Sequence, residues 1–518
     1  MSYMMMIKNI RLIVLLALFT ASGCSTNPVT GEKELLLISE TQELDIGKQN
    51  YAPLRQSQGG DYVVGPGIEA YVDRVGQRLA AVSDRPLPYE FKVINNSSPN
   101  AWALPGGKIA INRGLLTELE SEAELAAVLG HEIVHAAARH SAKGIQRGML
   151  LQGAVFATAI ATRDEGYSNL AQLGASVGAQ LVNQKYGRDA ERESDLYGMN
   201  YMSRAGYDPQ GAVQLQQTFV KLSEERRQDW LSGLFASHPP SQERVQNNIQ
   251  NATTLPAGGD TGRERYRQSV ARLLKAKPAY ANYDKAEKAL AEGDTRKAQA
   301  LVTKAIALEP GEGHFHSLLG DIERKNKKPG AARRHYDKAI ALNGDFFYYH
   351  LKRGLVNEQL NNRSAARRDL ERSVKLLPTA NAFNALGNIA REERKYDQAK
   401  QYYAKAADHD STVGKAAFAA LVELDLPENP GKYLKVRTGI NQSGKLLAEI
   451  SNPTPRDVTG LVLALQYPDD SGRMRSVRHA LSGQLKSGQK ETVSLGISVK
   501  LEQVRQVRSG IVAARIAP

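Results

Sequence analysis

The sequence has almost no cysteine: Cys24 is the only one among 518 residues. Disulfide bonds within the chain therefore cannot contribute to its stability. The sequence also contains no motif of the kind that binds RNA or DNA, so we predict no nucleic-acid partner. The formal net charge of +13 is then explained by solvated Lys and Arg side chains, with attraction to anionic lipid headgroups as the alternative.

The N-terminal segment lacks the length of a membrane-spanning helix. Lys8 and Arg11 form a basic start, and the apolar run over 12–19 is shorter than the roughly 20 residues that a bilayer requires. This pattern predicts a secretory signal peptide over residues 1–23. The small residues before Cys24 resemble a bacterial lipobox, which implies that Cys24 is lipidated as the first residue of the mature protein. An ordinary signal peptide followed by a chance cysteine is the alternative.

The residue after this cysteine bears on the location of the protein. Ser25 stands where an Asp would resemble a signal for retention in the inner membrane. We therefore expect a lipid-anchored protein of the periplasm, at the outer membrane rather than the inner membrane.

Composition divides the rest of the chain into several parts, and its length alone favours about three domains. Residues 24–60 are expected to form an extended tether with short elements, and residues 61–255 mix helical and strand patterns. The stretch 251–262 is rich in Pro and Gly and is predicted to be a linker that few contacts cross. Residues 265–424 are helical throughout, and residues 432–518 contain short β-rich segments that predict a small β-sandwich-like module.

The helical part is a repeat. Glycines recur at Gly320, Gly354 and Gly387, and a second small residue follows each of them after twelve positions, at Ala332, Ala366 and Ala399. This period resembles the tetratricopeptide repeat, in which small residues allow paired helices to pack closely. The resemblance implies an α-solenoid whose concave surface binds peptides or proteins, with a purely structural spacer as the alternative.

The chemistry is concentrated in the segment His131-Glu132-Ile133-Val134-His135, which lies in a helical pattern. Residues four apart share one face of a helix, so both imidazoles can bind one Zn²⁺. The Glu132 carboxylate lies one residue further on, where it can accept a proton from water activated by the metal.

A catalytic zinc site needs a third protein ligand. Ala138 and Ser141 occupy the positions where a metzincin has Gly and His, so that arrangement is excluded. Glu191 and Asp195 share a helix face further along the chain and predict a zinc ligand and a hydrogen-bond acceptor for a ligand histidine. Glu193 points to the opposite face, and the choice of Glu191 over Glu193 depends on the helical register. The alternative is a solvated charged helix.

His140 follows the motif by five residues, and we expect it to point away from the metal in a structural or surface role.

Together with Ser237-His238-Pro239 and Arg244, these motifs resemble those of the M48 peptidases. The lipobox, the segments 27–31 and 105–107 and the repeats make the chain most similar to the periplasmic β-barrel-assembly-enhancing protease group. The resemblance covers about residues 24–420.

The resemblance implies one Zn²⁺ per chain, held by His131, His135 and Glu191, with Glu132 as the general base and acid. It places His238 as a fourth ligand or latch and Arg244 near the site.

The implied fold is multidomain: an α+β zincin-type metallopeptidase domain, an α-solenoid of tetratricopeptide repeats and a C-terminal β-sandwich-like module. The implied function is zinc-dependent endopeptidase activity on envelope proteins, in quality control or assembly of outer-membrane proteins. The repeats are expected to dock the outer-membrane assembly machinery. The alternative is a non-proteolytic periplasmic chaperone or scaffold with a capped or structural zinc site.

Overall fold

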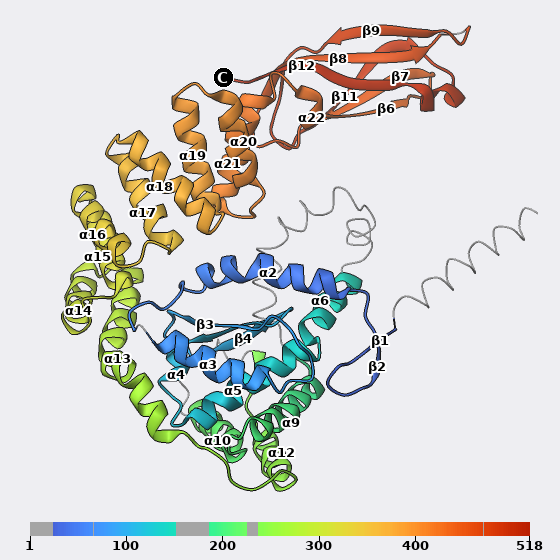
Figure 1. The fold of residues 1–518 in the computed structure, drawn as a ribbon. Helices are drawn as coiled ribbons and strands as arrows, with labels where there is room; N and C mark the ends of the chain where they lie inside the picture. Colours follow the sequence, from blue (N-terminus) through green and yellow to red (C-terminus); the bar gives the residue numbers. More distant parts are fainter. Residues whose placement is uncertain (1–23, 66, 152–185, 225–236, 470) are drawn as a thin grey trace, which may run out of the picture. The chain divides into compact units, whose positions relative to one another are not determined.

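The computed structural model describes the chain except for residues 1–23, 66, 152–185, 225–236 and 470 (Figure 1). The chain forms two compact units, one up to Phe346 and one from Phe347 onward. Among the helices that the structure describes, none combines the length and apolar composition needed to cross a bilayer.

A three-stranded sheet forms the centre of the first unit. Its strands are β3 (Glu90–Ile94), β4 (Ala101–Leu104) and β5 (Lys108–Asn112), in the order β3-β5-β4. Strand β3 runs parallel to β5, and β4 runs antiparallel to it. Within the described residues, β4 therefore forms one edge of the sheet.

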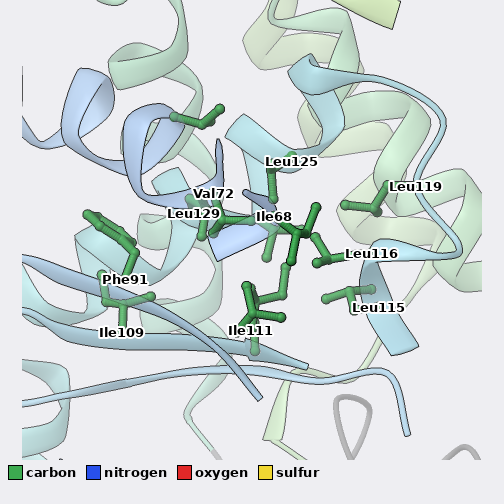
Figure 2. Close-up of a cluster of buried hydrophobic side chains, with 14 of the residues drawn as sticks. Ile68, Val72, Phe91, Ile109, Ile111, Leu115, Leu116, Leu119, Leu125 and Leu129 are labelled. Carbon is green, nitrogen blue, oxygen red and sulfur yellow. The ribbon is translucent and has the colours of Figure 1, made fainter. Parts of the chain in front are cut away.

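The two faces of this sheet are covered by different helices, because successive side chains of a strand point to opposite sides. Phe91, Ile109 and Ile111 belong to a buried cluster with α3 (Ile68–Ala80) and α5 (Glu122–Ala137), shown in Figure 2. Trp102 and Leu104 belong to a second cluster with Tyr51 and Leu54 of α2 (Glu40–Ser57). The sheet thus supports α5, which carries the HExxH motif.

Residues 24–60 are not an extended tether. Strands β1 (Cys24–Thr26) and β2 (Lys33–Leu35) pair as a hairpin, and α2 follows with a capping box at Ser39. The buried Glu43 of α2 binds the guanidinium groups of Arg85 and Arg139, with N–O distances of 2.9 and 2.7 Å. The expectation failed because α2 is needed to cover one face of the sheet, a long-range contact that local composition does not report.

The structure describes five further helices in this region. They are α4 (Arg113–Leu116), α6 (His140–Leu151), α9 (Arg188–Arg204), α10 (Gln210–Glu224) and α12 (Gln242–Thr253).

Many contacts cross the Pro- and Gly-rich stretch 251–262, contrary to the sequence-based expectation. Helix α13 (Arg263–Ala291) begins directly after it, and the Tyr266 hydroxyl donates to the Leu116 carbonyl at 2.6 Å. The Arg265 guanidinium donates to the buried Glu122 carboxylate at 2.7 Å. The stretch contains turn-forming residues, but a turn can still lead a helix back onto the same core.

The repeat pattern corresponds to paired helices. In the first unit α13 pairs with α14 (Thr295–Leu308), and α15 (Gly313–Lys325) pairs with α16 (Pro329–Leu342). A Cβ atom at Gly320 would lie 2.6 Å from the Tyr336 ring, and one at Gly387 would lie 2.6 Å from the Tyr403 ring. The glycines therefore mark the close approach of each helix pair, as the period predicts.

The second unit continues with helices and ends in strands. The helices are α17 (Phe347–Gln359), α18 (Arg363–Leu376), α19 (Ala380–Glu392), α20 (Tyr396–Ala407), α21 (Thr412–Asp425) and α22 (Pro430–Tyr433).

The strands and the short 3₁₀-helix η1 are β6 (Lys435–Ile440), β7 (Lys445–Ser451), β8 (Val458–Pro468), β9 (Met474–Ala480), β10 (Gln484–Leu485), β11 (Lys490–Ser498), η1 (Leu501–Gln506) and β12 (Arg508–Ile516). They form two antiparallel sheets, β11-β7-β6 and β10-β8-β12 with β9 also on β8. Both sheets contribute to one apolar core, for example through Leu446 and Leu463. The predicted fold class is confirmed.

Leu273 of α13 belongs to the same buried cluster as residues of α3, α5 and the central sheet. This shared core predicts that a change in α13 destabilises the peptidase region. Leu273 is 3% exposed and its neighbour Leu274 is 40% exposed. We expect Leu273→Ala to lower the free energy of unfolding by about 2–5 kcal/mol, because it leaves a cavity in the shared core. The measurement is urea unfolding followed by tryptophan fluorescence, since both tryptophans, Trp102 and Trp230, precede α13 in the chain.

Leu274→Ala is the matched control and should leave the urea midpoint of the fluorescence transition unchanged. Equal transitions for wild type and Leu273→Ala would show that α13 unfolds independently of the sheet.

Candidate active site

Helices α5 and α9 cross at a pair of glycines, and this crossing brings the candidate ligands together. A Cβ atom at Gly130 would lie 3.1 Å from the Gly198 carbonyl oxygen, and one at Gly198 would lie 3.0 Å from the His131 backbone nitrogen. Side chains at these positions would push the helices apart. Gly130 directly precedes the HExxH motif, and its role was not anticipated from the sequence.

Four side chains point their ligand atoms at one buried position. These atoms, from His131, His135, Glu191 and His238, all lie within 4.8 Å of one another. The Nε2 atoms of His131 and His135 are 3.0 Å apart, and Glu191 Oε1 lies 3.4 Å from His135 Nε2. The Glu193 carboxylate lies outside this cluster, so the geometry favours Glu191 in the choice between the two.

The donor set fits zinc. Zn²⁺ prefers imidazole nitrogen and carboxylate oxygen in a tetrahedral arrangement, with three protein ligands at a catalytic site. Burial holds the pKa of His135 well below its ordinary value, so this imidazole is neutral and can bind a metal. Burial alone would raise the pKa of Glu191, but the nearby His238 and His131 outweigh it and hold that pKa well below its ordinary value.

His238 lies inside the cluster rather than beside it. Its Nδ1 atom is 2.9 Å from Glu191 Oε1 and 3.2 Å from His131 Nε2, and its Nε2 atom is 3.6 Å from Glu132 Oε1. Burial would lower the pKa of His238, but the carboxylates of Glu191 and Glu132 raise it above the ordinary value.

Asp195 of α9 and Arg244 of α12 support the cluster. Asp195 Oδ1 lies 3.0 Å from His131 Nδ1, and the Arg244 guanidinium donates to both Asp195 oxygens at 2.7 Å. Arg244 Nη1 also lies 2.9 Å from Glu191 Oε2. These contacts orient the His131 ring so that its Nε2 atom faces the cluster.

Glu132 has the environment of a proton acceptor. Burial raises the pKa of its carboxyl group above the ordinary value. Its Oε2 atom has no hydrogen-bond partner among the described residues. A cavity of about 30 Å³ adjoins Glu132 and His131, which is enough for a water molecule.

His140 is not among the four residues that gather at the candidate metal position, as expected, but it lies directly beside one of them. Its Nδ1 atom lies 2.9 Å from His135 Nδ1, and the residue is 5% exposed. Burial excludes the surface role and leaves the structural one. The chain changes direction here, because α5 ends at Ala137 and Arg139 has a φ of +61°. This left-handed residue redirects the chain and turns His140 back towards His135.

Tyr186 was not anticipated either. Its ring stacks on His135 with centroids 3.9 Å apart, and its hydroxyl lies 2.9 Å from the Ser141 hydroxyl. No local sequence pattern marks a single tyrosine that packs on a histidine from a distant segment.

The comparisons with known proteins agree with this geometry. The model of "Peptidase family M48" matches residues 66–251, and tetratricopeptide-repeat models match residues 283–345 and 380–411. The chain is 31% identical over 180 residues to "Metalloprotease YcaL" of Escherichia coli, an alignment that covers 34% of this chain and 68% of that protein. This chain belongs to peptidase family M48.

Two further relatives extend the comparison beyond the M48 region. The chain is 25% identical over 381 residues to the "Beta-barrel assembly-enhancing protease" of Yersinia pestis, which covers 64% of this chain and 77% of that protein. It is 30% identical over 225 residues to a Vibrio cholerae relative, covering 42% of this chain but only 45% of that protein. The match to family M48 covers His131, His135 and Glu191, and the tetratricopeptide-repeat matches lie further along the same chain.

The contact between Asp195 and His131 predicts an effect on metal affinity. We expect Asp195→Asn to weaken zinc binding by about 10–100-fold, because the ligand histidine loses its charged hydrogen-bond acceptor. Zinc affinity is measured by competition with a chromophoric chelator. Asp189→Asn, a fully exposed position in the first turn of α9, should bind zinc as tightly as wild type. Equal affinities for all three proteins would contradict a supporting role for Asp195.

Proposed function

We propose that this protein is a zinc-dependent endopeptidase of the bacterial cell envelope. The observation that carries the proposal is the buried cluster of His131, His135 and Glu191, with the carboxylate of Glu132 beside it. Membership of family M48 supports the same activity.

In this proposal His131, His135 and Glu191 hold one Zn²⁺. The bound ion would supply Lewis-acid chemistry, by polarising the carbonyl of the scissile peptide bond and making water a stronger acid. Glu132 accepts the proton of the attacking water and later donates it to the leaving amine. Asp195 and Arg244 keep His131 in the tautomer that presents Nε2 to the metal.

The substrate is proposed to bind as an extended strand. Strand β4 forms an edge of the sheet within the described residues and packs against α5. A peptide paired with that edge would form main-chain hydrogen bonds and pass near the metal ligands on α5.

The proposed setting is the periplasm, with the chain anchored at the outer membrane through lipidated Cys24. The relative in Yersinia pestis is named for β-barrel assembly, and its match includes most of this chain. We propose envelope proteins as substrates, with quality control or assembly of outer-membrane proteins as the role. The repeats over 265–424 are proposed to dock the assembly machinery.

The rival is a chaperone or scaffold whose zinc site is structural or capped. The position of His238 inside the cluster favours a capped state. The position of Glu132 is evidence against a purely structural site. Four ligands close a structural zinc site, which needs no proton acceptor, yet Glu132 Oε2 is buried without a hydrogen-bond partner among the described residues.

The first test concerns Glu132. We expect Glu132→Gln to bind zinc normally and to lose proteolysis of casein by about 10²–10⁴-fold, since the amide cannot accept the proton. Glu120→Gln, an exposed position just before α5, is the matched control and should keep full activity. Comparable cleavage by wild type and Glu132→Gln would rule out the proposed mechanism, whereas zinc loss in that variant would make Glu132 a ligand.

A second test concerns His238. If His238 restrains the enzyme, His238→Ala should raise proteolysis several-fold, because a fourth protein ligand would occupy the position that the attacking water needs. Turnover of an unfolded substrate is measured together with zinc content and thermal melting.

The alternatives for His238 give different results. A role in stabilising the transition state predicts a large loss of activity in a protein that is folded and zinc-loaded. A packing role predicts a lower melting temperature. Either result would remove the latch from the proposal.

A further inference from the structure

The hairpin that begins at Cys24 contacts α9, the helix that carries Glu191. Asn27, at its turn, is 2% exposed and donates from Nδ2 to Glu193 Oε1 on α9 at 3.1 Å. The Asn27 side-chain oxygen accepts the backbone N–H of Val29 at 2.9 Å, so the turn holds the amide in place. The first residues of the described chain thus touch the helix that carries Glu191.

A series of contacts connects Asn27 to His135. Glu193 Oε1 lies 3.5 Å from His140 Nε2, and His140 Nδ1 lies 2.9 Å from His135 Nδ1. His135 directs its other nitrogen, Nε2, into the cluster, 3.0 Å from His131 Nε2. The order is therefore Asn27, Glu193, His140, His135, and each member contacts the next.

One assignment of protons satisfies every contact in this series. His135 must keep the lone pair of Nε2 for a metal, so its proton is on Nδ1 and is donated to His140 Nδ1. His140 then carries its proton on Nε2 and donates it to the Glu193 carboxylate. Asn27 donates to the same carboxylate oxygen. Glu193 therefore fixes the tautomer of His140, and His140 fixes that of His135.

The two histidines of the motif are supported in different ways. His131 Nδ1 faces a carboxylate directly, that of Asp195. His135 reaches its carboxylate, Glu193, through a second imidazole. Both carboxylates come from α9, the helix that also carries Glu191, the third candidate ligand.

A separate set of contacts holds the hairpin in this position. Arg139, directly before His140, donates to Ser25 Oγ at 3.1 Å and to the Ile38 carbonyl at 2.9 Å. The same guanidinium binds Glu43 of α2 at 2.7 Å. The residue that turns the chain between α5 and α6 is thus tied to the hairpin and to α2.

We propose that Asn27, Glu193 and His140 are positioning residues for the metal ligand His135, so that the hairpin next to Cys24 forms part of the metal site. This inference rests on the proposed zinc peptidase function. The hairpin acts through hydrogen bonds that orient a ligand, and it touches neither the metal nor the substrate.

The test is zinc affinity of the chain from residue 24 onward, measured by chelator competition. His140→Leu removes both nitrogens and should weaken zinc binding by about 10-fold or more. His140→Asn keeps an acceptor near the position of Nδ1 and should restore part of the affinity. Glu193→Ala and Asn27→Ala should weaken binding progressively less, because they lie further along the series.

A double variant tests whether Glu193 acts through His140. In a protein that carries His140→Leu, the added change Glu193→Ala should weaken zinc binding no further, whereas independent effects would add. The absorption spectrum of the Co²⁺-substituted protein gives a second readout, since it changes with the orientation of His135 and not with global stability.

Matched controls separate positioning from folding. Asp189→Ala on α9 and Thr30→Ala in the hairpin should bind zinc as wild type does, and thermal melting of the metal-free variants should match wild type. Affinity within twofold of wild type for Glu193→Ala and both His140 variants would overturn the inference, as would equal losses in the controls. Failure of the wild type to bind zinc would instead overturn the proposed function on which the inference rests.

Discussion

The site depends on the close crossing of α5 and α9. The HExxH segment presents two imidazoles on one helix face, but the third ligand and both supporting carboxylates come from the other helix. Their side chains are short, so the helix backbones must approach until Gly130 meets Gly198. A larger residue at Gly130 or Gly198 would move Glu191 away from the two histidines, even if the HExxH motif were intact.

The crossing creates an electrostatic problem that the surrounding residues address. Glu132, Glu191 and Asp195 are all buried near one another, and buried like charges are unfavourable unless cations or hydrogen bonds compensate them. Arg244 binds two of these carboxylates, and the imidazoles of His131 and His238 lie between them. A divalent cation would compensate the remaining negative charge of these carboxylates. The excess of buried negative charge therefore favours zinc binding.

The peptidase core extends beyond the residues that carry the motifs. Helix α13 shares a buried core with α3 and α5, and the N-terminal hairpin and α2 cover the other side of the sheet and the junction of α5 with α6. The first repeat helix is thus a structural part of the catalytic unit.

The sequence alone determined what depends on local spacing. Residues four apart share a helix face, so His131 and His135 were predicted as a pair. The same periodicity placed Glu191 and Asp195 on one face and Glu193 on the other, but it left the choice of the ligand to the helical register. The small residues of the repeat were recognised for a similar reason, since helix pairs of one type recur at a fixed period.

Only the tertiary structure decided the contacts between distant segments. The contact of His140 with His135 was not foreseen, because one residue with positive φ, Arg139, ends the helical register. Tyr186 and Gly198 carry no local pattern, and the segment 27–31 did not indicate the contact that Asn27 makes with α9. These roles arise where separate elements meet. A turn-rich composition at 251–262 indicated a linker, yet α13 packs on the core because its buried face matches a surface formed by residues more than a hundred positions earlier. Such packing depends on shape complementarity between segments, which no single stretch of sequence contains.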